Sequence, residues 1–296
     1  MLNSTVISTQ FPMDRIEDIK ADPSQFRLLE KVALGGQLPV ALADPVGDER
    51  AMCLLDFETT GLSSQTDRII ELGMIKVDYS PSANRVTRVL DSVSMYEDPG
   101  IPIPEVITQI TGICDEDVKG KAIDESVVEA WMKECGLVVA HNAGFDRGFF
   151  DKRFPHLNSL PWACSLKDVD WRELGFEGNK LEYLLLKLGY FYDGHRAEVD
   201  CFAMAWLFHL VPESLAMLRI NAGRVERVIK AVRAPFEVKD SLKGQGYRWN
   251  GDKKYWHKSV DESELEEELL RLGGLYDLTR FPPDVTETVT AKNRYS

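Results

Sequence analysis

Apolar positions along residues 51–98 fall in three runs whose lengths and patterns are typical of β-strands. The runs are AMCLLDFETT at 51–60, RIIELGMIKVDYS at 68–80 and RVTRVLDSVSMYED at 85–98. A turn-prone segment, Pro81-Ser82-Ala83-Asn84, separates the second run from the third. The pattern therefore predicts three strands in succession.

Farther along the chain, helical periodicity surrounds one buried strand. The apolar run LVVAHN at 137–142 is typical of a strand that is covered on both faces. Consecutive strands followed by strands that alternate with helices predict an α/β fold, with a mixed sheet flanked by helices. The predicted helices cover residues 104–110, 123–136, 145–154, 179–190 and 197–211.

The first fifty residues carry a weaker pattern. The segment SQFRLLEKVAL at 24–34 predicts a short amphipathic helix, with Phe26, Leu29 and Val32 on one face. The Gly-, Pro- and acid-rich residues after it predict a linker that ends near Arg50. We therefore expect residues 1–50 to be an N-terminal extension.

A second unit is predicted after Pro212, because the composition changes there and the elements follow the order βαββα. This order is sufficient for a small domain over residues 224–280. The Asn250-Gly251 pair is a type I′ turn signal, and the polar residues 281–296 predict a tail. The predicted elements are a strand at 224–232, a helix at 235–246, a hairpin at 247–259 and a helix at 262–274.

The composition is that of a folded protein from a reducing compartment. A length of 296 residues allows one large domain with additions or two domains, and 44% hydrophobic residues exclude wholesale disorder. The five cysteines include no C-x-x-C pair, so we expect reduced thiols. No signal sequence is recognisable and the longest apolar run, 202–211, is too short to cross a bilayer. These features predict a cytoplasmic protein with no membrane contact.

Charge is distributed unevenly along the chain. The net charge of −13 argues against nucleic-acid binding through bulk charge. Residues 224–260 nevertheless hold ten Lys and Arg against four Asp and Glu, which gives a local net charge of +6. The second unit therefore contains a basic segment, although the net charge of the whole chain is negative.

Two acidic side chains share one face of the first predicted strand. Side chains alternate along a strand, so Asp56 and Glu58 point together while Cys53, Leu55 and Phe57 point the other way. Burying two neighbouring carboxylates is costly unless a cation binds them. In the simpler alternative, this is an exposed edge strand and both acids are solvated.

Three more residues extend this acidic pattern. Asp146 starts a helix, where it could simply favour the helix N-terminus, and His195 precedes a helix that contains Asp200 among apolar neighbours. Converging carboxylates can bind two divalent cations about 4 Å apart, a layout suited to hydrolysis of a phosphodiester. A histidine can accept the proton of the attacking water. Carboxylate oxygens favour Mg²⁺ or Mn²⁺ over Zn²⁺.

These residues lie in three motifs that resemble those of the DEDDh family of 3′–5′ exonucleases, which have an RNase H-like fold. The match covers roughly residues 51–213 and keeps the family's order. The sister DEDDy family has Tyr four residues before its last Asp, where this chain has Arg196, with His195 one position earlier. The motifs are Asp56-Phe57-Glu58-Thr59-Thr60-Gly61, His141-Asn142-Ala143-Gly144-Phe145-Asp146 and His195-Arg196-Ala197-Glu198-Val199-Asp200.

The resemblance implies a role for each motif residue. Asp56 would bridge two Mg²⁺ or Mn²⁺ ions, Glu58 and Asp200 would complete one site, Asp146 would act at the other, and His195 would be the general base. A further set would contact the 3′-terminal nucleotide, although Thr, Gly and Ile at these positions could equally be turn or core residues. This set is Thr59, Thr60, Gly61, Leu62, Thr111, Gly112, Ile113, His141, Asn142 and Phe145.

The basic C-terminal segment allows two interpretations. Arg248, Lys253 and Lys254 could contact phosphates while neighbouring aromatic rings stack on bases. Alternatively, the rings form the core of the small domain and the cations are solvated. We expect at least half of the rings to be core and the basic face to contact nucleic acid. The rings in question are Tyr247, Trp249, Tyr255 and Trp256.

The sequence thus predicts a metal-dependent exonuclease. We expect it to act on single-stranded 3′ ends of DNA or RNA, in replication, repair or RNA turnover, and to release nucleoside 5′-monophosphates. A homodimer or a polymerase or repair partner fits the resemblance. The alternative is a non-catalytic nucleic-acid-binding or polymerase-associated scaffold on the same fold.

Overall fold

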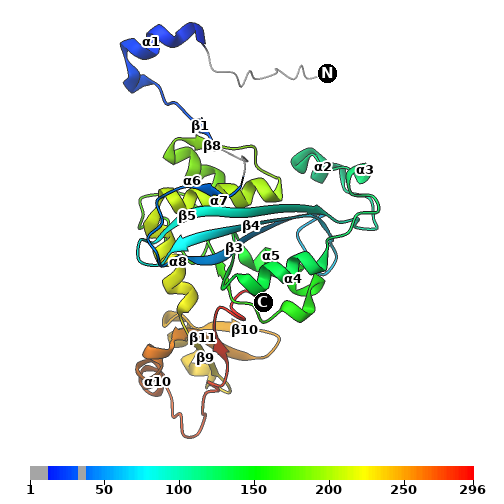
Figure 1. The fold of residues 1–296 in the computed structure, drawn as a ribbon. Helices are drawn as coiled ribbons and strands as arrows, with labels where there is room; N and C mark the ends of the chain where they lie inside the picture. Colours follow the sequence, from blue (N-terminus) through cyan, green and yellow to red (C-terminus); the bar gives the residue numbers. More distant parts are fainter. Residues whose placement is uncertain (1–12, 33–37) are drawn as a thin grey trace, which may run out of the picture.

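The computed structural model describes residues 13–32 and 38–296. A six-stranded sheet in the order β2-β5-β4-β3-β6-β7 forms the centre of the larger unit (Figure 1). Neighbours from β2 to β3 are antiparallel, whereas β6 and β7 are parallel to β3. The strands are β2 (Val40–Ala41), β3 (Arg50–Thr59), β4 (Ile69–Ser80), β5 (Arg85–Tyr96), β6 (Val138–Ala140) and β7 (Trp162–Cys164).

Helices cover both faces of this sheet, which confirms the predicted mixed α/β fold of RNase H-like type. Figure 1 shows α6 and α7 on one side of the sheet and α4 and α5 on the other. Two short helices, α2 and α3, lie beyond the end of β5. The helices are α2 (Glu105–Thr111), α3 (Asp115–Val118), α4 (Glu125–Glu134), α5 (Ala143–Arg153), α6 (Leu181–Leu188), α7 (Ala197–Leu210) and α8 (Pro212–Gly223), with a 3₁₀ turn at Pro155–Leu157.

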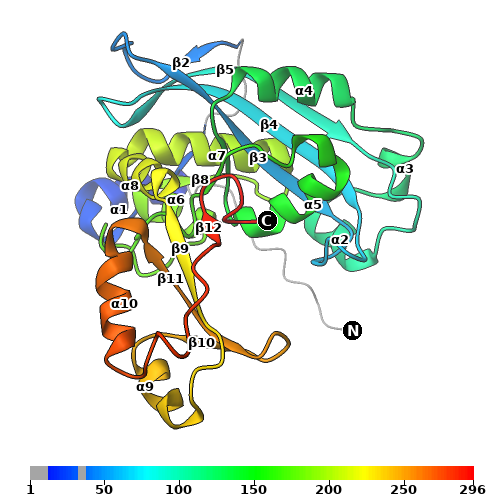
Figure 2. The same ribbon diagram turned by 90° about the horizontal axis from the view of Figure 1, so that it is seen from below.

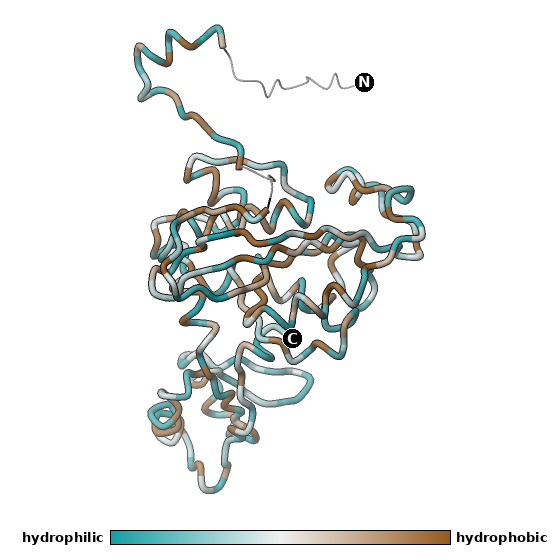
Figure 3. Tube along the Cα trace, in the orientation of Figure 1, coloured by the Kyte–Doolittle hydropathy of each residue, from teal (hydrophilic) through white to brown (hydrophobic). Residues whose placement is uncertain are grey.

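The alternation along β3 determines which side chains face which layer. Met52 and Leu54 belong to the apolar cluster that contains α7, while Cys53, Leu55 and Phe57 belong to the cluster that contains α4 and α5. Apolar segments run along the central strands (Figure 3). Because β3 is buried on both faces, the exposed-edge alternative for Asp56 and Glu58 is wrong.

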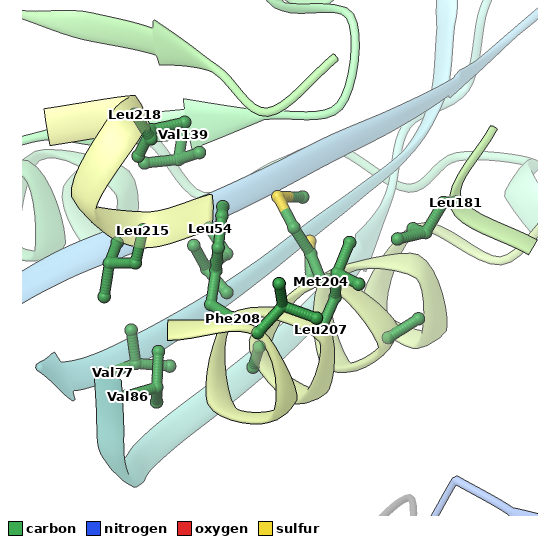
Figure 4. Packing of buried hydrophobic residues seen from close by; sticks show 14 of the residues in the cluster. Leu54, Val77, Val86, Val139, Leu181, Met204, Leu207, Phe208, Leu215 and Leu218 are labelled. Atoms are coloured by element: carbon green, nitrogen blue, oxygen red, sulfur yellow. The ribbon is translucent and has the colours of Figure 1, made fainter. Parts of the chain in front are cut away.

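The cluster on the α7 side is built from side chains that are far apart in sequence (Figure 4). Met204, Leu207 and Phe208 of α7 pack against the sheet and are each 0% exposed. Leu54 of β3 and Val77 of β4 face them and are equally buried. Truncating one such side chain to Ala typically costs about 2–5 kcal/mol, so this layer holds α7 firmly on the sheet.

A smaller unit with its own core follows α8. Its four-stranded sheet has the order β10-β11-β9-β12, and all neighbouring strands are antiparallel. The predicted βαββα order is present, and a further strand, β12, extends it to βαββαβ. The elements are β9 (Glu226–Ala231), a 3₁₀ turn (Phe236–Val238), α9 (Lys239–Gly244), β10 (Arg248–Asn250), β11 (Tyr255–Asp261), a second 3₁₀ turn (Glu262–Glu264), α10 (Leu265–Gly273) and β12 (Thr288–Val289).

The prediction of a polar tail at 281–296 is wrong, because these residues pack back onto both units. Figure 2 shows β12 beside β9. The buried Arg147 side chain donates hydrogen bonds to the carbonyls of Ala291 and Lys292, and Arg294 donates to the carbonyl of Arg224 at 2.7 Å. Polar composition did not indicate this packing, because most of the contacts use backbone carbonyls and strand pairing, which do not depend on apolar side chains. We call residues 288–296 the C-terminal strap.

The N-terminal prediction also needs correction. Within the described part of 24–34, the chain forms no helix of the predicted length: Pro23–Gln25 is a 3₁₀ turn and β1 (Glu30–Lys31) pairs in parallel with β8 (Tyr190–Phe191). Residues 33 and 34 lie outside the described residues. A short helix that was not predicted, α1 (Ile16–Ala21), follows a 3₁₀ turn at Met13–Arg15 and lies away from the sheet (Figure 1).

The turn between β10 and β11 is not the predicted two-residue type I′ turn. Asn250 is paired with Tyr255, so four residues form the loop. The N–H of Lys254 donates to the Asn250 carbonyl at 2.8 Å, and Lys254, not Gly251, has a positive φ of 58°. The Asn250 side chain accepts from the N–H of Lys253 at 2.9 Å, which stabilises this wider loop.

All five cysteines lie in the described residues and are free thiols, four of them buried. In the same part of the chain, no helix has by itself the length and apolar composition needed to cross a membrane. Helices α7 and α8 meet those criteria only as a joined pair, which is bent by 104°.

Candidate active site

Three carboxylates converge where β3 meets the first turn of α7. Asp56 and Glu58 come from β3 and Asp200 from α7, and one oxygen of each lies within 4.8 Å of the others. Helix α7 also lies against β4, the strand next to β3, and this close approach depends on Gly73 of β4, because a Cβ there would lie 2.2 Å from the backbone carbon of Ala197. We call Asp56, Glu58 and Asp200 the carboxylate cluster.

The fourth predicted acid reaches this site from the opposite layer. Asp146 lies in the first turn of α5 and is 1% exposed. Its Oδ1 accepts a hydrogen bond from the N–H of Phe57 at 3.2 Å. Phe57 is the residue between Asp56 and Glu58, so this bond holds Asp146 against β3 beside both acids. The structure thus brings together all four acids that the motifs indicate.

Burial raises the pKa of every acid in this group. Desolvation and the neighbouring Asp146 and Asp200 raise the pKa of Asp56 well above its usual range. Burial raises the pKa of Glu58 to about 8 and that of Asp146 to about 8, and also raises the pKa of Asp200. Like charges held this close in a protein interior need protons or cations to offset them. The donors are all carboxylate oxygens, so the site fits Mg²⁺ or Mn²⁺.

Hydrogen bonds fix the orientation of Asp200. The hydroxyl of Tyr192 donates to Oδ1 at 3.0 Å, and the N–H groups of His195 and Arg196 donate to Oδ2 at 3.0 and 3.3 Å. The carboxylate therefore cannot rotate freely between the helix and the cluster. Tyr192 was not predicted from the sequence. Its position eight residues before Asp200 matches no simple helix or strand spacing.

His195 occupies the loop just before α7 and is exposed to solvent. Its φ of 66° lies in the left-handed region, which His adopts more readily than most residues but still rarely. Among the described residues its ring has no hydrogen-bond partner, while its N–H is bound to Asp200. The backbone is thus anchored at the cluster, and the ring remains available to a water molecule or a substrate.

An ion pair between a buried acid and a partly exposed arginine lies beside the cluster, and it was also missed. Glu71 of β4, which is 0% exposed and paired with Glu58 across the strands, accepts hydrogen bonds from both Nε and an Nη of Arg196 at 3.1 and 3.0 Å. Arg196 also donates to the hydroxyl of Tyr96 at 2.7 Å, and Ser94 donates to Glu71. A lone acid in the apolar run RIIELGMIKV was the available sequence signal. The pair fixes the loop that carries His195.

The predicted nucleotide-binding turn after β3 is folded around internal hydrogen bonds. The Thr59 hydroxyl donates to the Gly61 carbonyl at 2.6 Å, and the Thr60 hydroxyl accepts from the Arg68 N–H at 3.0 Å. Both threonines are buried, whereas Leu62 is 88% exposed. Of these residues, Leu62 therefore offers the most accessible apolar surface.

The predicted contacts at the end of α2 divide into two groups. Ile113 is 1% exposed and packs in a small apolar cluster, and the buried Thr111 uses its hydroxyl within its own turn. In this structure both are interior residues, which corrects their assignment as direct contacts. Gly112 caps α2 with φ 73° and is exposed, and the neighbouring Ile110 is 48% exposed.

The second motif begins with a histidine that has a structural role. The ring nitrogens of His141 bond to the Ser165 hydroxyl at 2.7 Å and to the Asn179 carbonyl at 2.9 Å. Burial lowers its pKa to about 4, so the ring stays neutral near pH 7. Asn142, with φ 92°, is exposed at the start of α5, and Phe145 is half-buried beside Phe149.

The raised pKa values predict that the metal-free protein loses stability as pH rises. The unfolded chain releases these protons near pH 4, while folded Glu58 and Asp146 hold them up to about pH 8. Between these values the folded state binds more protons, so the free energy of unfolding falls with increasing pH. Melting temperatures measured in EDTA across this range should show the fall. The Asp56→Asn variant should flatten it, and a wild-type curve no steeper than that of the variant would contradict the prediction.

Comparisons with known proteins agree with this geometry. The family model described as "Exonuclease" matches residues 53–208. The PolC-type DNA polymerase III of Listeria welshimeri is 32% identical over 196 residues, which are 62% of this chain and 13% of that protein. The corresponding protein of Clostridium perfringens is 32% identical over 158 residues, 50% of this chain and 10% of its own length. The chain thus spans about a tenth of the length of these curated relatives.

Solved structures similar to this chain are also exonucleases. Escherichia coli exonuclease I with an oligonucleotide has a TM-score of 0.49 at 14% identity, over 77% of this chain and 68% of that one. Exonuclease X with a 5′-overhanging duplex DNA has a TM-score of 0.42 at 23% identity, over 57% of this chain and 99% of that one. Because the family model covers more than half of the chain and its three motifs are filled, this protein belongs to the exonuclease family, as a member of DEDDh type.

Proposed function

We propose that this protein is a divalent-metal-dependent 3′–5′ exonuclease that acts on single-stranded 3′ ends and releases nucleoside 5′-monophosphates. The observation that carries the proposal is the convergence of the carboxylate cluster with Asp146 beneath an available His195. A chain that folds several carboxylates into its interior must gain something from them, since their burial alone destabilises it. Cation binding is the function that uses them.

We assign a role in cation binding to each of the four acids. Asp56, Glu58 and Asp200 would hold one cation, and Asp56 with Asp146 would hold a second. When bound, two such cations lower the pKa of a water molecule and neutralise charge on the phosphate under attack. The chain's own contribution is position: Tyr192 and two backbone N–H groups hold Asp200, and the Phe57 N–H holds Asp146.

His195 would accept a proton from the attacking water. Its ring lies on a loop fixed at two points, by its own N–H on Asp200 and by the ion pair of Arg196 with Glu71. A general base held in this way needs little reorganisation before it accepts the proton.

The 3′-terminal nucleotide would lie between the exposed groups that surround the cluster. Leu62 would pack on the terminal base or sugar, and the exposed Ile110 and Gly112 would lie on the base side. Asn142 and Phe145 at the start of α5 would complete the pocket, with His141 holding that segment in place. Thr59, Thr60 and Gly61 shape the turn that presents Leu62.

We further propose a cellular role in DNA replication or repair, with single-stranded DNA as the first substrate to test and RNA as the second. The polymerase names of the relatives support association with a polymerase or repair partner. A homodimer and a cytoplasmic location remain part of this proposal. The non-catalytic scaffold is less favoured, because all five positions of the catalytic type are filled.

A digestion assay distinguishes the enzyme from the scaffold. Single-stranded DNA, single-stranded RNA and a duplex with a mismatched 3′ end are incubated with the protein and Mg²⁺ or Mn²⁺. The enzyme should shorten at least one single-stranded substrate. Retained binding with no nucleotide release under either cation would favour the scaffold.

A further inference from the structure

The β10–β11 hairpin of the C-terminal unit carries an exposed ring among cations. Arg248, Trp249, Lys253 and Lys254 are all exposed, and Trp249 is 52% exposed. Arg248 and Trp249 lie on the edge strand β10, and both lysines lie in the loop that follows. Both views of the ribbon show this hairpin projecting from the unit (Figures 1 and 2). We call these four residues the hairpin patch.

The structure assigns the aromatic residues of this segment to different places. Tyr247 is 1% exposed and belongs to the core of the unit. Trp256 is partly buried against that core, and Trp249, its cross-strand partner, packs on it with ring centroids 5.6 Å apart. One part of the Trp249 ring therefore packs on Trp256, while the residue as a whole stays exposed to solvent.

The cations of the patch differ from several other basic residues of the unit, which are neutralised by acids. Lys230 is paired with Asp284 and Glu287, and Lys258 with Glu268. Among the described residues, Arg248, Lys253 and Lys254 form no ion pair. Residues 248–254, which form β10 and the loop, contain a single acid, Asp252, against these three cations. Positive charge is thus available here for an external anion, even though the whole chain is acidic.

Both the loop and its attachment to the exonuclease unit are held in place. Asn250 bonds through its side chain and its carbonyl to the N–H groups of Lys253 and Lys254. The C-terminal strap joins the two units through Arg147 of α5, and the Trp162 N–H donates to the Ala291 carbonyl at 2.8 Å. The patch is therefore fixed relative to α5, the helix that carries Asp146.

We propose that the hairpin patch binds single-stranded nucleic acid upstream of the 3′ end that the active site holds. A base stacks on the open part of Trp249, and phosphates contact Arg248, Lys253 and Lys254. An exposed aromatic ring among unpaired cations is the chemistry that single strands recognise without regard to sequence. This inference rests on the proposed exonuclease function for its choice of ligand. It adds a second contact, so long strands bind more tightly than short ones.

Binding measured without hydrolysis tests this inference. The full-length protein in EDTA is titrated against fluorescent single-stranded DNA of about 20 nucleotides, longer than the ~4–16 nucleotides that one stacking domain occupies. Trp249→Ala is expected to raise the Kd about ten-fold, the size of one lost stacking contact. The triple variant R248Q/K253Q/K254Q should reduce the slope of log K against log salt by about 2, since each phosphate contact contributes about 0.7.

Matched variants control for fold and net charge. Leu270→Ala removes a 79% exposed apolar side chain from α10 of the same unit, and Lys133→Gln removes a cation from α4. Neither should change the Kd. With Mg²⁺ present, the patch variants should cleave a trinucleotide at the wild-type rate but bind long strands more weakly. Unchanged binding of the long strand by both patch variants would overturn the inference, whereas absence of cleavage by the wild type would count against the proposed function alone.

Discussion

Replacing Asp56 with Asn is expected to reduce phosphodiester hydrolysis by at least about 10³-fold while the chain stays folded. Burial raises the pKa of Asp56, and so do Asp146, Asp200 and Glu58, which places Asp56 at the centre of the acidic group. Asn keeps the shape of the side chain and removes the charge that would hold the cations. Losing several kcal/mol of charge stabilisation in the transition state corresponds to a loss of this size.

The same substitution should stabilise the protein when no metal is present. A neutral side chain at this position relieves repulsion among buried carboxylates, so the melting temperature in EDTA should rise by a few degrees. Added Mn²⁺ should then raise the melting temperature of the wild type more than that of the variant. Asp91→Asn, at an exposed position on strand β5 of the same sheet, is the matched control and should change neither activity nor stability. An Asp56→Asn protein with wild-type activity would refute the assignment.

Replacing His195 with Gln is expected to lower kcat by about 10²–10⁴-fold, the usual contribution of a general base. Gln retains a polar side chain but cannot accept the proton near neutral pH. The backbone N–H of residue 195 would still bind Asp200, so the cations should bind as in the wild type. Mn²⁺ titration followed by melting temperature checks that point independently of the rate.

The pH–rate profile separates a chemical role of His195 from a structural one. The wild-type single-turnover rate should fall in acid, where a protonated imidazole cannot accept the proton of the attacking water, and the His195→Gln profile should lack that fall. His156→Gln, which changes a surface histidine paired with Glu129, is the control and should keep the wild-type profile. If His195→Gln kept both the rate and the profile, another group would have to accept the proton.

The site residues whose positions follow from strand alternation or motif spacing could be predicted from the sequence. The β3 pattern placed Asp56 and Glu58 on one face, and the structure puts them with Met52 and Leu54 on the side of α7. Asp146 and Asp200 were predicted at helix starts, and they lie in the first turns of α5 and α7. Local periodicity is sufficient in these cases because the sheet buries both faces of β3.

Contacts between distant segments could not be predicted in this way. The pairing of Glu71 with Arg196 joins residues 125 positions apart, and Tyr192 reaches Asp200 from a loop. The same reason explains the errors at the two ends of the chain. Glu30 and Thr288 lie in strands of two residues that exist only because β8 and β9 offer partners, and such short pieces leave no periodic signal.

The account is tested most directly by the products that the wild-type protein forms from a 5′-labelled single strand with and without Mg²⁺. It predicts a ladder of labelled strands shortened stepwise from the 3′ end, together with nucleoside 5′-monophosphates. It also predicts that EDTA or Asp56→Asn abolishes both products. Equal cleavage in EDTA, or immediate release of the labelled 5′-terminal nucleotide, would contradict the proposed two-cation 3′–5′ exonuclease.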